Sequence, residues 1–74
     1  MKTMYSITMY ARNGNYRKFD TIYSEPESAI CAADRLLRDH TLHRVCVFAE
    51  TDKMSTQIWA LTSLPIFNEE GALP

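Results

Sequence analysis

The chain has 74 residues, of which 46% are hydrophobic and 23% are charged, and these are ordinary values for a folded domain. Eight Lys and Arg residues against nine Asp and Glu residues give a formal net charge of −1, so the strong basic field that binds duplex nucleic acid or an anionic membrane is absent. We therefore expect residues 1–74 to form one small domain, with an ordered core over about 3–61 and an irregular tail over 62–74.

The first two predicted elements are strands joined by a turn. Residues 3–11 alternate between apolar and polar side chains, which is typical of a half-buried strand, and a second strand is expected over residues 16–23. A three-residue loop from Arg12 to Gly14 places Gly14 where a positive φ is needed, whereas a two-residue loop would mix charged and apolar side chains on one face. The three-residue loop predicts the pairs Ile7–Phe19 and Tyr5–Thr21.

A helix is predicted to follow. Ser24 and Glu27 have the spacing of a capping box, with Pro26 between them in the first helical turn, and the helical pattern continues to about Asp39. Its predicted apolar stripe, which would pack on a sheet, consists of Ala29, Ile30, Ala33, Leu36 and Leu37.

Two further strands are expected over residues 43–50 and 55–61, joined by a hairpin loop at residues 51–54. The element order ββαββ predicts an α+β fold, with a four-stranded, mainly antiparallel sheet and the helix across one face. The order 2-1-3-4 lets the third strand lie antiparallel beside the first. The competing order, 1-2-3-4, contains a parallel central pair.

The later strands carry more apolar residues than one helix can cover, since residues 45–49 and 58–61 are apolar on both faces. If Val45, Val47 and Ile58 pack beneath the helix, the opposite face receives Phe48, Trp59 and Leu61. Either the tail segment from Leu64 to Phe67 folds back over that face, or the face binds another protein.

The residue types that carry chemistry do not form a recognised site. His40 and His43 lie where the helix meets the third strand, without the converging ligand set that zinc requires. Cys31 and Cys46 fall inside apolar stretches and are expected to be small buried thiols. We therefore expect no catalytic residue, metal or cofactor, and the protein is not expected to be an enzyme.

The chain has neither a signal-peptide pattern at its start nor a stretch of about 20 apolar residues that would cross a bilayer. A cytoplasmic location without membrane contact is the resulting expectation.

The outer face of the first hairpin suggests an alternative function. The predicted register brings Tyr10 beside Tyr16 and Thr8 beside Lys18, with Arg12 in the loop. Aromatic and cationic side chains on an open sheet bind single-stranded bases. A Tyr–Tyr pair also stabilises a hairpin in the absence of any ligand.

The helix start from Tyr23 to Ile30, set between two short hairpins, resembles that of several small phage-encoded anti-CRISPR proteins. The resemblance covers most of residues 3–61 and concerns architecture, not sequence motifs. It implies a stoichiometric inhibitor that occupies the surface of a host defence ribonucleoprotein complex. The family shares no catalytic motif, and the net charge of −1 departs from its strongly acidic members.

Together these observations predict a protein that binds another protein without catalysis, either as an inhibitor or adaptor of a larger complex or as a homodimer. The alternative is single-stranded nucleic-acid binding by Tyr10, Tyr16, Lys18 and Arg12. The predicted protein-binding residues combine an apolar centre with a charged rim. They are Phe48, Trp59, Leu61, Arg12, Arg17, Lys18 and Asp52.

Overall fold

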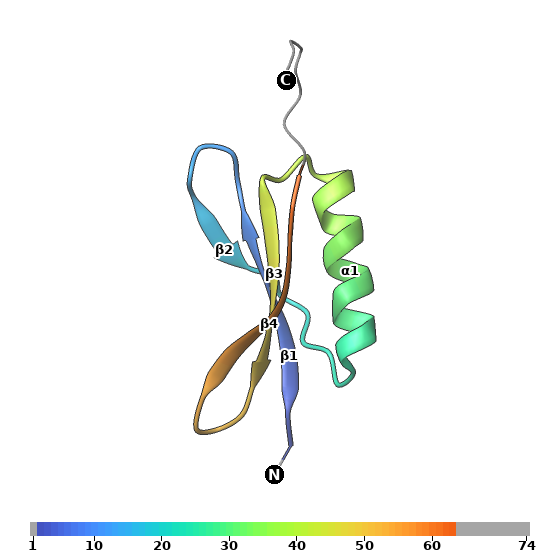
Figure 1. Ribbon diagram of the computed structural model, residues 1–74, viewed down its shortest axis with the longest axis vertical. Helices are drawn as coiled ribbons and strands as arrows, with labels where there is room; N and C mark the ends of the chain where they lie inside the picture. The colour runs from blue at the N-terminus through green and yellow to red at the C-terminus, as the bar shows by residue number, and fades with distance from the viewer. Residues whose placement is uncertain (1, 64–74) are drawn as a thin grey trace.

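The computed structural model describes residues 2–63, which form one helix and one four-stranded sheet (Figure 1). The strands are β1 (Met4–Tyr10), β2 (Tyr16–Lys18), β3 (Arg44–Glu50) and β4 (Ser55–Thr62), and the helix is α1 (Pro26–Asp39). The order in the sheet is β2-β1-β3-β4, with antiparallel neighbours throughout. The predicted α+β fold and its 2-1-3-4 order are therefore confirmed, and the competing order is wrong.

The end of β4 differs from the predicted boundary. The strand continues to Thr62, one residue past the expected end of the core. The rest of the predicted tail, from residue 64, lies outside the described residues. The suggested return of Leu64 to Phe67 over the sheet lies there too.

The first hairpin has the predicted three-residue loop. Its register pairs Tyr10 with Tyr16, and the Ala11 N–H donates to the Asn15 carbonyl at 2.8 Å. Gly14 has a φ of +94°, a conformation that side chains disfavour and glycine adopts readily. The turn residues thus fix the register in which β2 pairs with β1.

The pairing changes after β2. The Phe19 N–H donates to the Ile7 carbonyl at 2.8 Å, as the predicted register requires. Tyr5, however, exchanges backbone hydrogen bonds of 2.8 and 2.9 Å with Tyr23, so the predicted pair of Tyr5 with Thr21 is wrong. Two extra residues loop out between the two contacts, and the large Tyr23 side chain packs against the core in place of a threonine.

The predicted capping box at the start of α1 is also wrong. Glu25 is the N-cap, with φ −122° and ψ 136°, and makes no side-chain cap hydrogen bond. The residue before a proline is driven into extended backbone, and Pro26 is well suited to the first helical turn. The helix therefore begins directly after Glu25, and Ser24 lies one residue too early to cap it.

The core forms where α1 crosses the central strands β1 and β3. Ala29 and Ala33 are fully buried, and Leu37 is nearly so, on the side of the helix that faces the sheet. Ile30 and Leu36 are partly buried beside them, so the predicted apolar stripe is confirmed. The sheet supplies three fully buried residues to this core: Ile7, Val45 and Val47.

The helix ends in a strained turn. The Leu42 N–H donates to the Leu37 carbonyl at 3.4 Å across a residue with positive φ, the arrangement of a Schellman motif. That residue is Thr41, with a φ of +53°. A β-branched side chain is unfavourable in left-handed backbone, so this turn stores strain.

Replacing Thr41 with glycine is expected to remove that strain. Thr41→Gly should raise the free energy of unfolding by about 0.5–1 kcal/mol, net of the extra entropy of glycine in the unfolded chain. Urea denaturation measures the change. Gly14→Ala, at the other positive φ, should lower the free energy of unfolding. A Thr41→Gly protein less stable than the wild type would show that the turn is unstrained.

Candidate functional site

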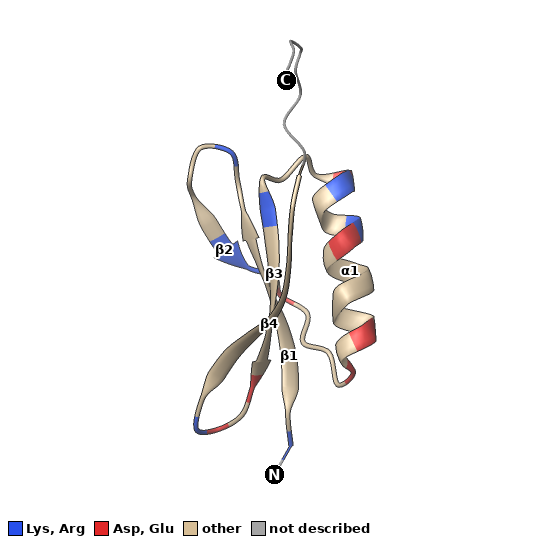
Figure 2. Cartoon of the chain, viewed as in Figure 1, with Lys and Arg blue, Asp and Glu red and all other residues tan. Residues whose placement is uncertain are grey.

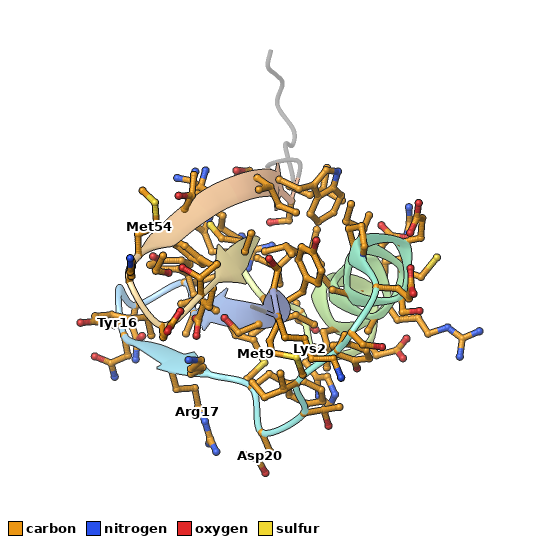
Figure 3. The ribbon with its side chains drawn as sticks, turned by 90° about the horizontal axis from the view of Figure 1, so that it is seen from below. Lys2, Met9, Tyr16, Arg17, Asp20 and Met54 are labelled. Atoms are coloured by element: carbon orange, nitrogen blue, oxygen red, sulfur yellow. The ribbon has the colours of Figure 1, made fainter. Side chains whose placement is uncertain are left out.

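The helix covers one face of the sheet and leaves the other uncovered among residues 2–63. We call this uncovered surface the open face. Figure 3 views the sheet from its end: α1 lies on one side of the central strands, and the labelled Tyr16 and Met54 lie on the other. The strand registers assign these side chains to the open face: Met4, Ser6, Thr8, Tyr10, Tyr16, Lys18, Arg44, Cys46, Phe48, Glu50, Ser55, Gln57, Ala60 and Thr62.

A β-bulge decides which apolar residues reach the open face. Val47 pairs with Trp59, whereas the next residue, Phe48, pairs with Gln57, so Ile58 is an extra residue in β4. A bulge reverses the alternation of side chains along the strand. As a result Trp59 packs against the core on the helix side, and Ile58 is 45% exposed.

The predicted placement of three residues is therefore wrong. Trp59 and Leu61 lie on the same face as α1, because they pair with Val47 and Val45 of the core. Ile58, which was expected beneath the helix, is exposed. Of the three apolar residues predicted for the uncovered face, only Phe48 lies there, half-buried opposite Ser6.

Aromatic side chains dominate the β1–β2 end of the open face. The rings of Tyr10 and Tyr16 lie 5.6 Å apart between centroids, with 30° between their planes, which confirms the predicted pair. Tyr16 is 71% exposed, the largest exposure among the large hydrophobic residues described. The pair presents a broad aromatic surface at the sheet edge.

A chain of polar contacts crosses the middle of the open face. The Lys18 ammonium lies 3.0 Å from one carboxylate oxygen of Glu50 and donates to the other at 3.2 Å. The Ser6 hydroxyl donates to the same carboxylate at 2.5 Å. The Ser6 hydrogen bond, followed by the contacts with Lys18, holds the pKa of Glu50 below its ordinary value of 4.5. These contacts among Lys18, Ser6 and Glu50 link β2, β1 and β3.

The centre of the open face is shielded from solvent even though no element covers it. Ser6 is 2% exposed and Cys46 is 1% exposed. Both are small residues with larger neighbours on the same face, among them Phe48 and Tyr10. The accessible part of this face therefore consists of its larger side chains.

The predicted charged rim is divided among different parts of the molecule. Arg12 is exposed in the β1–β2 loop and donates to the Ser63 hydroxyl at 3.4 Å, and Asp52 is exposed in the β3–β4 loop. These loops lie at opposite ends of the sheet, and Figure 2 shows basic residues on the first loop, on β2 and at the start of β3. Arg17 pairs with Met9 and so points to the other face from Lys18.

Arg17 borders a shallow apolar hollow between β2 and α1. Because α1 does not reach β2 in the described structure, the core-side surface of the first hairpin stays partly open. The hollow is lined by Met9, Arg17, Phe19, Asp20, Leu36, His40 and Leu42.

Sequence reasoning missed two polar residues of the open face. Arg44 pairs with Tyr10, and its buried Nε has no hydrogen-bond partner among the described residues. Glu50 neutralises Lys18, a contact across β1 that no local pattern reveals. The register between β1 and β3 would have placed both residues, because their open-face positions follow from the pair Ile7–Val47.

The cysteines differ in exposure. Cys46 is buried as predicted, but Cys31 is exposed on α1, and both thiols are free. Cys31 lies two residues after the buried Ala29, about 200° around the helix, which turns it to solvent. Within residues 2–63, His, Cys, Asp and Glu form no cluster of three that would hold a metal ion.

Comparison with known proteins gives no relative: no family model, curated protein or solved structure matches this chain. In the described part of the chain, no helix has the length and apolar character needed to cross a membrane. The open face and the edges of the sheet are therefore the surfaces from which we infer a function.

The contacts of Glu50 with Ser6 and Lys18 make the stability of the fold depend on pH. Since the folded state lowers the pKa of Glu50, the ionised carboxylate stabilises the protein above pH 4.5, and this contribution is lost as the pH falls through the lowered pKa. Glu50→Gln should reduce the free energy of unfolding by about 0.5–1 kcal/mol at pH 7, because the groups are partly exposed. Urea denaturation across this pH range should show wild type and variant converging in acid.

Asp52→Asn, in an exposed loop, is the control and should not produce this convergence. Stability curves of wild type and Glu50→Gln that stay parallel down to the acid limit would contradict the assigned role of Glu50.

The corrected position of Trp59 makes it a stability residue. Trp59→Ala should lower the free energy of unfolding by about 2–3 kcal/mol, since the ring packs against the core but is not fully buried. Tyr16→Ala, at a largely exposed position, should change it by less than about 1 kcal/mol. Far-UV circular dichroism follows both transitions, because Trp59 is the single tryptophan of the chain. Equal effects of the two variants would contradict the assignment of Trp59 to the helix side.

Proposed function

We propose that this chain is a non-catalytic protein-binding module that uses its open face to occupy the surface of a larger protein complex. One observation supports this proposal above the others: α1 covers a single face of the sheet, and no element within residues 2–63 covers the other. Large side chains remain on that face at its rim. Such a surface is typical of a docking site.

The open face has the composition of an interface. Tyr10, Tyr16 and Phe48 supply aromatic area, and tyrosine loses little conformational entropy when it is buried by a partner. The tilted packing of Tyr16 against Tyr10 restrains its ring before any partner arrives. Restraint of this kind lowers the entropic cost of binding.

The charges of the open face favour a partner with an acidic patch. Lys18 is neutralised by Glu50 inside the protein, so its charge is largely satisfied. Arg44 and the nearby loop residue Arg12 have no such carboxylate partner among the described ion pairs. An acidic group that docks beside Tyr10 would therefore meet two guanidinium groups, which donate well to carboxylates.

The class of target follows from the resemblance to small phage-encoded inhibitors. We infer a host defence ribonucleoprotein complex as the partner, blocked by occupation of its surface. The two free thiols are compatible with a reducing compartment, which supports action in the cytoplasm.

A second candidate function, binding of single-stranded nucleic acid, is favoured by the Tyr10–Tyr16 pair. Two aromatic rings beside Arg12 and Arg44 would stack bases and contact phosphates. The neutralisation of Lys18 removes one of the cations on which this reading depends. We therefore rank it below protein binding.

A photo-crosslinking residue at the rim of the open face tests the proposal. With p-benzoylphenylalanine in place of Tyr16, crosslinking in the native cells should capture one protein. The same residue in place of Arg35, which is exposed on α1, should not capture it. Tyr16→Ala should weaken binding to the captured protein by about tenfold or more, whereas Arg35→Ala should not.

The other outcomes are also decisive. Nucleic acid crosslinked at position 16, with an affinity that falls steeply as salt rises and is lost in Tyr10→Ala, would favour the second candidate. Equal capture from positions 16 and 35 would refute both functions for the open face.

A further inference from the structure

The two edges of the sheet differ sharply in length and charge. The β2 edge has three paired residues, two of which are Arg17 and Lys18, and it is interrupted where the chain loops out before Tyr23. The β4 edge runs for eight residues with one bulge, at Ile58, and none of Ser55 to Thr62 is charged or a proline. Short, charged edges resist pairing with another strand, and long neutral ones favour it.

The outer side of β4 has no neighbouring strand in the described structure. Its outward N–H and C=O groups are therefore free to pair with a further strand. The side chains along this edge add apolar surface, because Ile58 is 45% exposed at mid-strand and Met54 is 64% exposed just before the strand begins. Both the backbone and the side chains of β4 thus present an interaction surface.

We propose that β4 pairs antiparallel with the β4 of a second copy of this chain, about a two-fold axis, and so joins two four-stranded sheets into one continuous sheet. This inference concerns a different surface from the open face and does not depend on the proposed function. A two-fold axis makes the interface self-complementary. If one residue of the first copy contacts a second residue of the other copy, the same contact is made again with the two copies exchanged.

Charge is the first reason that the partner is a second copy. Antiparallel self-pairing of a strand brings equivalent residues close together, so a charged edge would repel itself. Self-pairing through β2 would bring Arg17 and Lys18 near their own counterparts, whereas β4 has no charge to repel. A pairing of β2 with β4 would leave free edges and build an open fibre, and the short cationic β2 opposes it.

Shape is the second reason. When two copies of β4 overlap fully, Ile58 of one copy lies opposite Trp59 of the other, near the two-fold axis, where apolar and aromatic side chains stabilise cross-strand pairs. The same alignment places the exposed Met54 of each copy beside the end of the other's β4, at the two ends of the interface.

The oligomeric state of the purified full-length chain tests this inference. Sedimentation equilibrium should give twice the 8.5 kDa protomer mass at micromolar concentration. Ile58→Lys should weaken the dimer at least tenfold, since two like charges meet at the axis. Ile22→Lys is the matched control, because Ile22 is 43% exposed, close to the 45% of Ile58, but lies outside β4. That variant should remain a dimer.

Far-UV circular dichroism establishes that each variant is folded. If Ile58→Lys does not fold, Thr56→Lys, at an exposed position of the same strand, replaces it. A monomeric wild type overturns the inference. So does a dimer that persists in the folded β4 variants, or one that Ile22→Lys disrupts equally. None of these results bears on crosslinking from Tyr16, so failure of the dimer and failure of the open-face proposal are distinguishable.

Discussion

The close approach of α1 to the central strands is the contact on which the rest of the structure depends. Ala29 and Ala33 end at Cβ, so the helix backbone lies near the sheet, and both are fully buried against Ile7, Val45 and Val47. A single helix of 14 residues in this position contacts β1, β3 and β4 but does not reach β2 within the described chain. The uncovered face and the partly open first hairpin follow from this one placement (Figure 1).

The open face combines apolar area with polar groups that are already satisfied. Glu50 accepts from both Ser6 and Lys18, so a partner that docks there does not leave that carboxylate unpaired. For the proposed protein-binding role, the remaining sources of specificity are the aromatic rim and the two arginines, Arg12 and Arg44, at its basic end. The neutral edge of β4 is a separate surface, and the dimer proposed for it would derive its affinity mainly from backbone hydrogen bonds.

Local sequence signals predicted much of this fold. The features that they missed depend on contacts between residues that are far apart in the sequence. Gly14 and the alternation of β1 fixed the hairpin register, and helical spacing predicted the buried stripe of α1, because each signal acts within a few residues. The bulge at Ile58 depends on how β4 pairs with β3 and packs against the helix, and it turned Trp59 to the helix side and left Ile58 exposed. The Glu50–Lys18 contact spans three strands, so it had no local signature either.

In the described structure, β2 is an edge strand that pairs only with β1. β2 hydrogen-bonds to β1, its backbone lies away from α1 in the described structure, and it is otherwise held by the Tyr10–Tyr16 packing and the Lys18–Glu50 ion pair. Elements with few buried contacts open at a lower free energy than the body of a domain. The ring of Tyr16 therefore lies on a strand that is less firmly attached to the core than β1 and β3 are, while its packing on Tyr10 keeps the two rings together if β2 shifts.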